Sequence, residues 1–261
     1  MVGVKAKYSL LVLILILAIT LVFVSSSYGS LLVEEIISKL EASSNKIRDY
    51  QGLMVVTVKE DGRKRKGKIR IMVKKPDKLL IELLSPPLSA GQIIVVNGKK
   101  VWMYDPDYNE VRICDLSQVP QVNKLSPERT NLDIMKMLYD VELLGQEKIG
   151  EEKAYVLELK SKNGVQGKER IWIDSQRWIV LQLAFYDPME NLLKKTIFKD
   201  IRKVNDDAWM AFRQNDYDSR GRLIRTVVFQ DDISFNTDIP EGKFVFKIPE
   251  GARIIDYTKE K

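Results

Sequence analysis

The residue types that most often perform chemistry in proteins are nearly missing from this chain. Its 261 residues include no histidine and a single cysteine, Cys114. Without histidine there can be no Ser-His-Asp or Cys-His nucleophile system, no histidine-ligated zinc and no imidazole acid or base. With one cysteine, neither an intramolecular disulfide nor a four-cysteine metal site can form. The composition therefore excludes much of hydrolase and metalloenzyme chemistry.

Short motifs that imitate functional sites each depart from the pattern that their chemistry requires. The stretch from Asp105 to Asn109 begins like a calcium loop, but Glu110 stands where glycine is needed and Leu116 where the glutamate ligand belongs. Ser43 and Lys46 have Ser-x-x-Lys spacing, but the partner motifs of that catalytic arrangement are absent. No glycine-rich phosphate loop is present, and nothing marks one pair among the 36 carboxylates for acid–base work. We therefore expect no enzymatic activity, no cofactor and no metal.

The first 29 residues differ in character from the rest of the chain. Lys5 and Lys7 precede an unbroken apolar run, Leu10 to Val24, and a stretch of small polar residues follows it. This order is typical of a secretory signal peptide. The run is shorter than the roughly 20 residues of a spanning helix, although the residues before it leave an uncleaved anchor open. We expect residues 1–29 to be a signal peptide or N-terminal membrane anchor and residues 30–261 to be a single domain. The protein is then exported, to the periplasm or to the extracellular face of the cytoplasmic membrane.

The net charge of +6 is small, and positive and negative residues are mixed along the chain. The sharpest basic cluster, Arg63-Lys64-Arg65-Lys66, directly follows Asp61-Gly62. We favour a solvated hairpin tip here, because charge on a loop tip needs no other reason; contact with anionic lipid headgroups or an acidic partner is the alternative. An exported chain without basic and aromatic strands is a poor candidate for binding nucleic acid.

The apolar pattern predicts one amphipathic helix followed by strands. Near-helical spacing relates Leu32, Ile36, Ile37, Leu40 and Ile47, and beyond Gly52 the period changes to two. Asn97-Gly98 between two β-rich runs is the strongest hairpin signal. A short helix is expected from Asn131 to Tyr139. Later strands are expected at Tyr155–Lys160, Glu169–Asp174, Trp178–Tyr186, Leu192–Asp200, Trp209–Tyr217 and Leu223–Phe229. The pattern indicates a mainly β antiparallel meander with a few helices.

Several strands carry large apolar side chains on both faces. The clearest are Leu79-Leu80-Ile81, Ile93-Ile94-Val95-Val96 and Trp178-Ile179-Val180-Leu181. An antiparallel sheet needs only one apolar face. A strongly curved sheet with helices over its concave side would bury both faces, and it would keep a hydrophobic hollow if the helices fill it incompletely. A filled sandwich or barrel core is the alternative, and composition does not separate the two.

Several motifs, in their order along the chain, resemble those of the LolA/LolB-like lipoprotein-carrier superfamily. The stretch Val73 to Glu82 resembles its strand–turn–strand signature, and Asn97 to Pro106 resembles its G-x-x-x-W-x-Y-x-P hairpin. Ile171 to Asp174 and the closing Phe244 to Gly251 are similar to its C-terminal half. The helix that ends at Asp49-Tyr50-Gln51-Gly52 also falls where this family has one. Each motif is weak alone, but their ordered sum is fairly specific.

The resemblance implies a curved antiparallel sheet that forms an incomplete half barrel, with helices covering its concave face. It also implies a non-enzymatic, extracytoplasmic, monomeric carrier that holds acyl chains of a lipid or lipoprotein in an apolar cavity. Alternation along the strands nominates twelve cavity residues: Ile71, Val73, Leu79, Ile81, Leu83, Ile94, Val96, Trp102, Tyr104, Trp172, Leu181 and Phe185. Lys75 stands where the bacterial carrier has an arginine implicated in keeping the cavity closed, and it is the candidate gate. A lysine cannot form the planar fork of an arginine, so this chain departs from the carrier at the gate.

A second hypothesis comes from a different functional class. The chain would be an envelope interaction protein, related to the anti-sigma-factor regulators that share the half barrel. The sheet and its edge would then bind a protein partner, such as an envelope membrane protein, and the cavity would be small or filled. Recovery of stoichiometric lipid with the purified protein would favour the carrier over this regulator.

Overall fold

The computed structural model describes residues 32–60, 62–86, 90–115, 118, 138–162, 167–205 and 208–259. The expected signal peptide or anchor at 1–29 lies outside these residues, and so does nearly all of the helix expected from Asn131 to Tyr139. In the described part, residues 32–45 are helical and fifteen strands form one sheet. No helix in this part combines the length and the apolar character that crossing a membrane requires.

The strands follow one another with short connections over most of the described chain. Their bounds are β1 Asp49–Glu60, β2 Arg63–Lys74, β3 Lys78–Ser85, β4 Ile93–Asn97, β5 Lys100–Asp105, β6 Glu110–Asp115, β7 Tyr139–Ile149, β8 Glu152–Ser161, β9 Lys168–Asp174, β10 Val180–Tyr186, β11 Leu192–Asn205, β12 Ala208–Asp218, β13 Leu223–Phe229, β14 Ser234–Phe235 and β15 Arg253–Asp256. Two short 3₁₀ helices complete the described elements, η4 Glu241–Phe244 and η5 Tyr257–Lys259.

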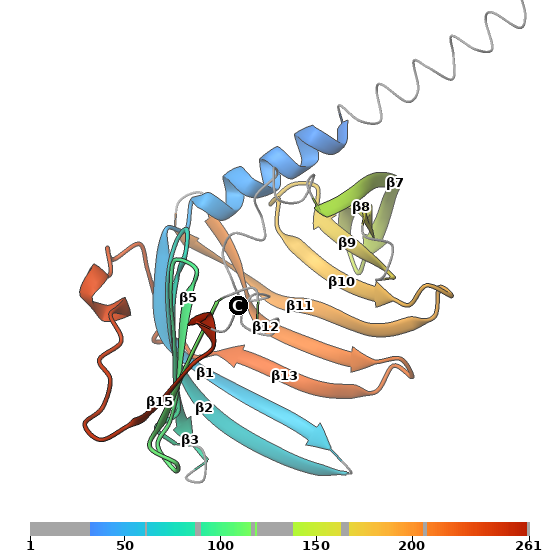
Figure 1. Cartoon of the computed structure of the whole chain (residues 1–261). Coiled ribbons are helices and arrows are strands. Elements are labelled where there is room, and N and C mark those ends of the chain that lie inside the picture. Colours follow the sequence, from blue (N-terminus) through green and yellow to red (C-terminus); the bar gives the residue numbers. More distant parts are fainter. Residues whose placement is uncertain are drawn as a thin grey trace, which may run out of the picture.

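The sheet is a single curved surface with two open ends. Its order is β15-β6-β5-β4-β3-β2-β1-β13-β12-β11-β10-β9-β8-β7, and β14 adds to β1. All neighbouring pairs are antiparallel except β15 with β6, which are parallel. Figure 1 shows the sheet bending around one side with the N-terminal helix lying across it, and the ends do not meet to close a barrel. The expected mainly β, incomplete half barrel is confirmed.

Local sequence signals explain much of this meander. Asn97 pairs with Lys100 across a two-residue turn in which Gly98 has φ +63°. Such turns favour Asn-Gly because glycine adopts a positive φ without strain, so the predicted hairpin is confirmed. The six strands expected after residue 155 are present as β8 to β13. Strands β7 and β15, at the two ends of the sheet, were not anticipated.

A C-terminal segment covers the outer face of the strands that are apolar on both sides. Phe244 of η4 is fully buried, and η4 contacts β3 and β4. Glu241 lies 3.1 Å from the ammonium groups of both Lys74 and Lys78, which hold the segment on the sheet. The inner face of the same strands carries a separate apolar cluster that includes Ile71 and Val101. The strands are therefore apolar on both faces because the outer face packs under the C-terminal segment and the inner face forms an apolar cluster of its own.

The N-terminal helix packs on the other part of the sheet. Its buried side chains Val33, Ile36, Ile37 and Leu40 contact the inner face of β8 and β9, where the partners are Leu157, Leu159, Ile171 and Ile173. These helix positions recur at the spacing expected of one apolar face. Packing at the N-terminal end of the helix thereby fixes where its C-terminal end lies.

Candidate functional site

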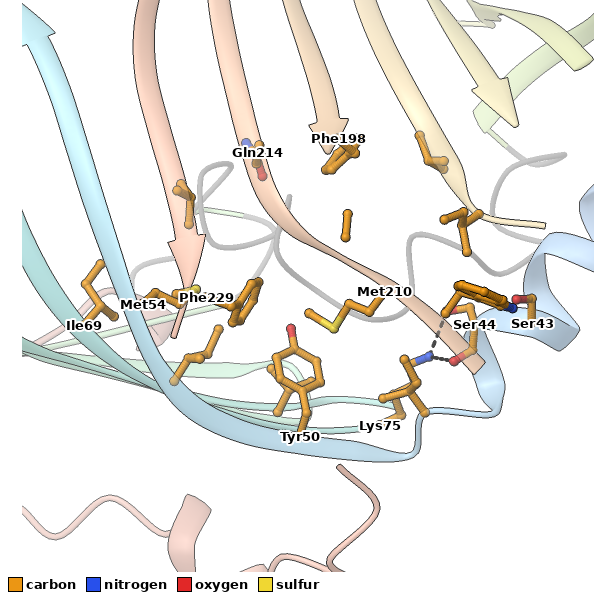
Figure 2. A pocket seen from close by; sticks show the side chains of 18 of the residues that line it. Ser43, Ser44, Tyr50, Met54, Ile69, Lys75, Phe198, Met210, Gln214 and Phe229 are labelled. Carbon is orange, nitrogen blue, oxygen red and sulfur yellow. Dashed lines mark hydrogen bonds between the residues drawn. The ribbon is translucent and has the colours of Figure 1, made fainter. Parts of the chain in front are cut away.

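An apolar cavity of about 490 Å³ lies between the C-terminal end of the helix and the concave face of the sheet (Figure 2). The chain up to the start of β1 contributes Leu40, Ser43, Ser44 and Ile47. The sheet and its connections contribute Tyr50, Met54, Val56, Ile69, Ile71, Val73, Lys75, Ile81, Trp178, Ile179, Val180, Phe198, Trp209, Met210, Ala211, Gln214, Arg225, Val227 and Phe229. Its volume lies within the roughly 300–1,000 Å³ of small-molecule sites.

Two small residues at the end of the helix help to keep this space open. Leu40, Ser43, Ser44 and Ile47 are spaced three and four apart, which places the helical positions among them on one face. The serine side chains are much smaller than the leucine and isoleucine beside them and do not fill the space below the helix. The Ser43 hydroxyl donates a hydrogen bond to the carbonyl oxygen of Arg177 at 3.2 Å, so it is satisfied without a ligand.

Cross-strand pairing assembles the floor of the cavity. Met54 of β1 pairs with Ile69 on one side and with Phe229 on the other. The ring of Phe229 meets the ring of Tyr50 edge to face at 6.1 Å between centroids. Burial raises the pKa of Tyr50 to about 12. The Tyr50 hydroxyl is therefore uncharged at neutral pH, and this part of the floor carries no charge.

Charged groups at one side of the cavity are already paired. The carboxylate of Asp216 is buried and accepts hydrogen bonds from Thr196 at 2.7 Å, Gln214 at 3.0 Å and Arg225 at 2.6 Å. Burial opposes ionisation of Asp216, but these hydrogen bonds, with the charges of Arg225 and Lys194, outweigh it and hold its pKa below the usual range. Arg225 therefore borders the cavity with a carboxylate partner in place.

Lys75, at the turn between β2 and β3, connects the sheet to the helix. Its ammonium nitrogen donates hydrogen bonds to the carbonyl oxygen of Ser44 and to the Ser44 hydroxyl, the latter at 2.7 Å (Figure 2). Burial lowers the pKa of Lys75 to about 8, because removal from water disfavours the charged amine. The contact ties the last turn of the helix to the edge of the cavity.

The structure brings four of the predicted residues to the cavity. Ile71, Val73, Ile81 and Lys75 line it. Four others, Leu79, Leu83, Ile94 and Val96, belong to the apolar cluster on the same face but lie outside the lining.

Two predicted aromatic residues of β5 lie on the outer face. Trp102 pairs with Val95, whereas Val96, one residue further on, belongs to the inner cluster. Side chains of neighbouring residues in a strand point to opposite faces, so Trp102 and Tyr104 point away from the cavity. The ring of Tyr104 accordingly packs against the ring of Phe246 in the C-terminal segment, with 6.4 Å between the ring centroids.

The remaining predicted residues belong to β9 and β10. Trp172 and Leu181 pack together on the face opposite the helix, and the Trp172 indole donates a hydrogen bond to Glu147 at 2.8 Å. A β-bulge between Val180 and Gln182 shifts the alternation at Leu181. Phe185 lies further along β10 and does not line the cavity.

Sequence reasoning missed the contribution of β1 and of β11 to β13. Met54, Phe198, Met210, Val227 and Phe229 line the cavity from these strands. Their alternation was weak because Gln214 and Arg225 share the same face. The two serines on the apolar side of the helix were the signal that could have located the space.

Within the described ranges, no group of three or more acidic or cysteine side chains is placed to hold a metal ion. The site offers an apolar volume, a satisfied polar margin and one half-buried amine, that of Lys75. These features suit the binding of a hydrocarbon surface.

The chain is similar to known proteins in sequence and in structure. A family model described only as an uncharacterized protein matches residues 75–247. An uncharacterized protein of Methanocaldococcus jannaschii is 22% identical over 95% of this chain and 60% of its own length. An outer-membrane lipoprotein carrier protein of Francisella philomiragia is 29% identical over 65% of this chain and 63% of its own length. The matches thus span about three fifths of the curated relatives.

Solved structures share the fold over most of the chain. A DUF1329 family protein from Desulfovibrio piger superposes with a TM-score of 0.66 at 20% identity, covering 82% of this chain and 97% of its own. An outer membrane lipoprotein-sorting protein domain from Vibrio parahaemolyticus superposes with a TM-score of 0.65 at 21% identity, covering 80% of this chain and 94% of its own. A LolA superfamily protein from Nitrosomonas europaea superposes with a TM-score of 0.60 at 19% identity, covering 82% of this chain and 97% of its own.

Proposed function

We propose that the chain is a non-enzymatic carrier for acyl chains of a lipid or lipoprotein, because it shares its fold with a LolA superfamily protein and is similar in sequence to outer-membrane lipoprotein carrier proteins. The apolar cavity between helix and sheet is the observation that carries this proposal. We place the protein outside the cytoplasm, as a monomer, with residues 30–261 as one domain. The lipoprotein carriers among its relatives support the location, and the continuous sheet supports the single domain.

Burial of hydrocarbon supplies the binding energy without any catalytic group. Each methylene removed from water contributes about 0.8 kcal/mol, so about ten methylenes contribute about 8 kcal/mol before the cost of ordering the chain. Met54, Val227 and Phe229 offer the contact surface. A ligand held in this way leaves when its cover moves.

The contact between Lys75 and Ser44 supports a gating role for Lys75. It joins the cavity edge to the one described helix that covers the cavity. Loss of this contact frees the C-terminal end of the helix, while the N-terminal end stays packed on β8 and β9. We propose that loading and release use this movement.

A matched pair of substitutions tests the carrier function. Val227 lines the cavity, and its neighbour Val228 points to the opposite face of β13. Val227→Trp should fill part of the cavity, whereas Val228→Trp adds the same volume elsewhere. Each protein is incubated with membrane lipid, purified again and analysed by native mass spectrometry.

We expect one lipid per chain for the wild type and for Val228→Trp, and at least a tenfold lower occupancy for Val227→Trp. Wild-type protein that never retains lipid, but purifies with a stoichiometric protein partner, would contradict the carrier and favour the envelope interaction protein. Equal occupancy in the two variants would place the lipid outside the cavity.

A further inference from the structure

A second hollow lies beside the apolar cavity, next to the C-terminal end of the helix. Its volume is also about 490 Å³. We call it the basic vestibule and define it by its lining: Lys39, Ala42, Ser43, Lys46, Gln176, Arg177, Trp178, Lys203 and Trp209. Four of these described residues are basic and none is acidic. Polarity therefore changes sharply from the apolar cavity to the vestibule.

The two spaces meet at shared residues. Ser43, Trp178 and Trp209 line both the cavity and the vestibule. A molecule that passes this junction would touch hydrocarbon side chains on one side and cationic groups on the other. An amphiphile has this combination of surfaces.

Contacts with neighbouring side chains hold the Trp178 ring in place beside the basic vestibule. Its ring stacks on Tyr155 at 5.8 Å, and the Lys39 ammonium lies 4.7 Å from the ring centroid. Trp178 also has φ +54°, a conformation that is strained for a bulky residue and persists only where the surroundings enforce it. Lys39 is thus held at the vestibule by a fixed aromatic surface.

The cations of the vestibule differ in how far carboxylates neutralise them. Arg177 donates from Nε to Asp174 at 2.7 Å and is also paired with Glu152 at 2.7 Å. Lys39 pairs with Glu35 at 2.7 Å, although both side chains are about half exposed. Lys203 forms no ion pair with any described residue. Among the described residues, positive charge is therefore least neutralised on the side of the hollow formed by β11, where Lys203 lies.

We propose that the basic vestibule holds the phosphate-bearing headgroup of an anionic amphiphile whose acyl chain occupies the apolar cavity. The proposal rests on the proposed function, because it assigns the head of the ligand whose tail that function places. Lysine ammonium groups bind phosphate oxygens as point charges, without the fixed geometry of an arginine fork. A free phosphate would satisfy the vestibule but gain nothing from the adjoining cavity.

The test compares two single-chain lipids of equal acyl length below their micelle concentration. Lysophosphatidylglycerol is anionic, whereas lysophosphatidylcholine carries a neutral zwitterionic headgroup. Binding is measured by isothermal titration calorimetry in moderate salt on wild-type protein, on K46Q/K203Q and on K64Q/K66Q. The last variant removes the same charge from the distant, exposed β1–β2 hairpin. Glycerol 3-phosphate alone provides the free-phosphate arm.

We expect the wild type to bind lysophosphatidylglycerol at least fivefold more tightly than lysophosphatidylcholine. K46Q/K203Q should lose about tenfold in affinity for the anionic lipid, from two charge contacts of about 0.7 kcal/mol each, and almost none for the zwitterionic lipid. K64Q/K66Q should match the wild type for both lipids. Glycerol 3-phosphate should bind at least a hundredfold more weakly than the anionic lipid.

Failure of this inference differs from failure of the proposed function. Equal affinity for the two lipids in all three proteins overturns the headgroup site and leaves acyl-chain binding intact. Glycerol 3-phosphate binding as tightly as the lipid overturns the amphiphile and indicates a separate phosphate site. Absence of binding by either lipid overturns the proposed function itself.

Discussion

The N-terminal helix meets two regions of the sheet in different ways. At its N-terminal end, Ile36 and Ile37 are almost fully buried against β8 and β9. At its C-terminal end, Ser43 and Ser44 stand over the open cavity. One helix therefore has a packed end, with β8 and β9, and an unfilled end, above β1, β2 and β13.

The difference shows how a fold can keep an empty apolar volume without losing its stability. Interiors are normally packed to the density of organic crystals, and a void weakens the structure because the atoms that line it lack neighbours on one side. Here the packed end anchors the helix, so the unfilled end does not have to. The gating proposed above uses this arrangement, since the cover over the cavity moves there while the packed end keeps the helix attached.

Truncating one isoleucine in each region should give the largest difference between the two regions, measured as the loss in free energy of unfolding. Ile37→Ala removes a fully buried side chain at the packed end and should lower the free energy of unfolding by about 3 kcal/mol. Ile69→Ala removes a half-buried side chain that already borders empty space and should cost about 1 kcal/mol. Urea denaturation measures both. Equal costs for the two variants would show that the cavity region is packed as tightly as the other.

The outer cover of the unfilled region depends on a buried carboxylate. Asp49 accepts hydrogen bonds from the backbone N–H groups of Thr237 at 2.9 Å and Asp238 at 3.1 Å. Asp49→Ala leaves both groups without this partner and should cost about 2 kcal/mol, again by urea denaturation. Hydrogen exchange should rise at residues 236–244 but not at β8. Exchange that rises equally in both places would contradict a cover that is local to one region.

The latch at the unfilled end, which is the contact between Lys75 and Ser44, should give stability its own pH dependence. Because burial lowers the pKa of Lys75 to about 8 from 10.5, the unfolded chain binds more protons between these pH values. The free energy of unfolding therefore rises with pH across this window. Relative to Lys75→Met, which cannot titrate, the wild type should gain about 1–2 kcal/mol from pH 8 to 10.5, after allowance for partial exposure. A constant difference between the two proteins would show that Lys75 is solvated and the latch absent.

The positions of the strands were predicted from the sequence more accurately than the face of the sheet on which each side chain lies. The turn at Asn97-Gly98 and the period-two runs depend on neighbours in the chain, and the structure confirms them. Which face of β5 is concave depends on sheet curvature and on the C-terminal segment. Val101 and Trp102 are both apolar, so alternation alone did not distinguish the inner face from the outer one.

The candidate site was predicted in part for the same reason. Ile71, Val73 and Ile81 were predicted from alternation along the two strands on either side of Lys75, which the fold places at the cavity edge. Val227 and Phe229 reach the cavity because β13 pairs with β1, about 170 residues earlier in the chain. No local pattern encodes that pairing.

The four tryptophans of the chain allow the most direct test of where the acyl chain lies. Trp178 and Trp209 line the cavity, whereas Trp102 and Trp172 lie on the outer face of the sheet. A lysolipid with a brominated acyl chain quenches indole fluorescence only at close contact. Binding of the lipid to each variant is first confirmed by native mass spectrometry. We predict strong quenching in W102F/W172F, which keeps the cavity pair, and almost none in W178F/W209F. Quenching confined to Trp102 and Trp172 would contradict an acyl chain held between the helix and the concave face.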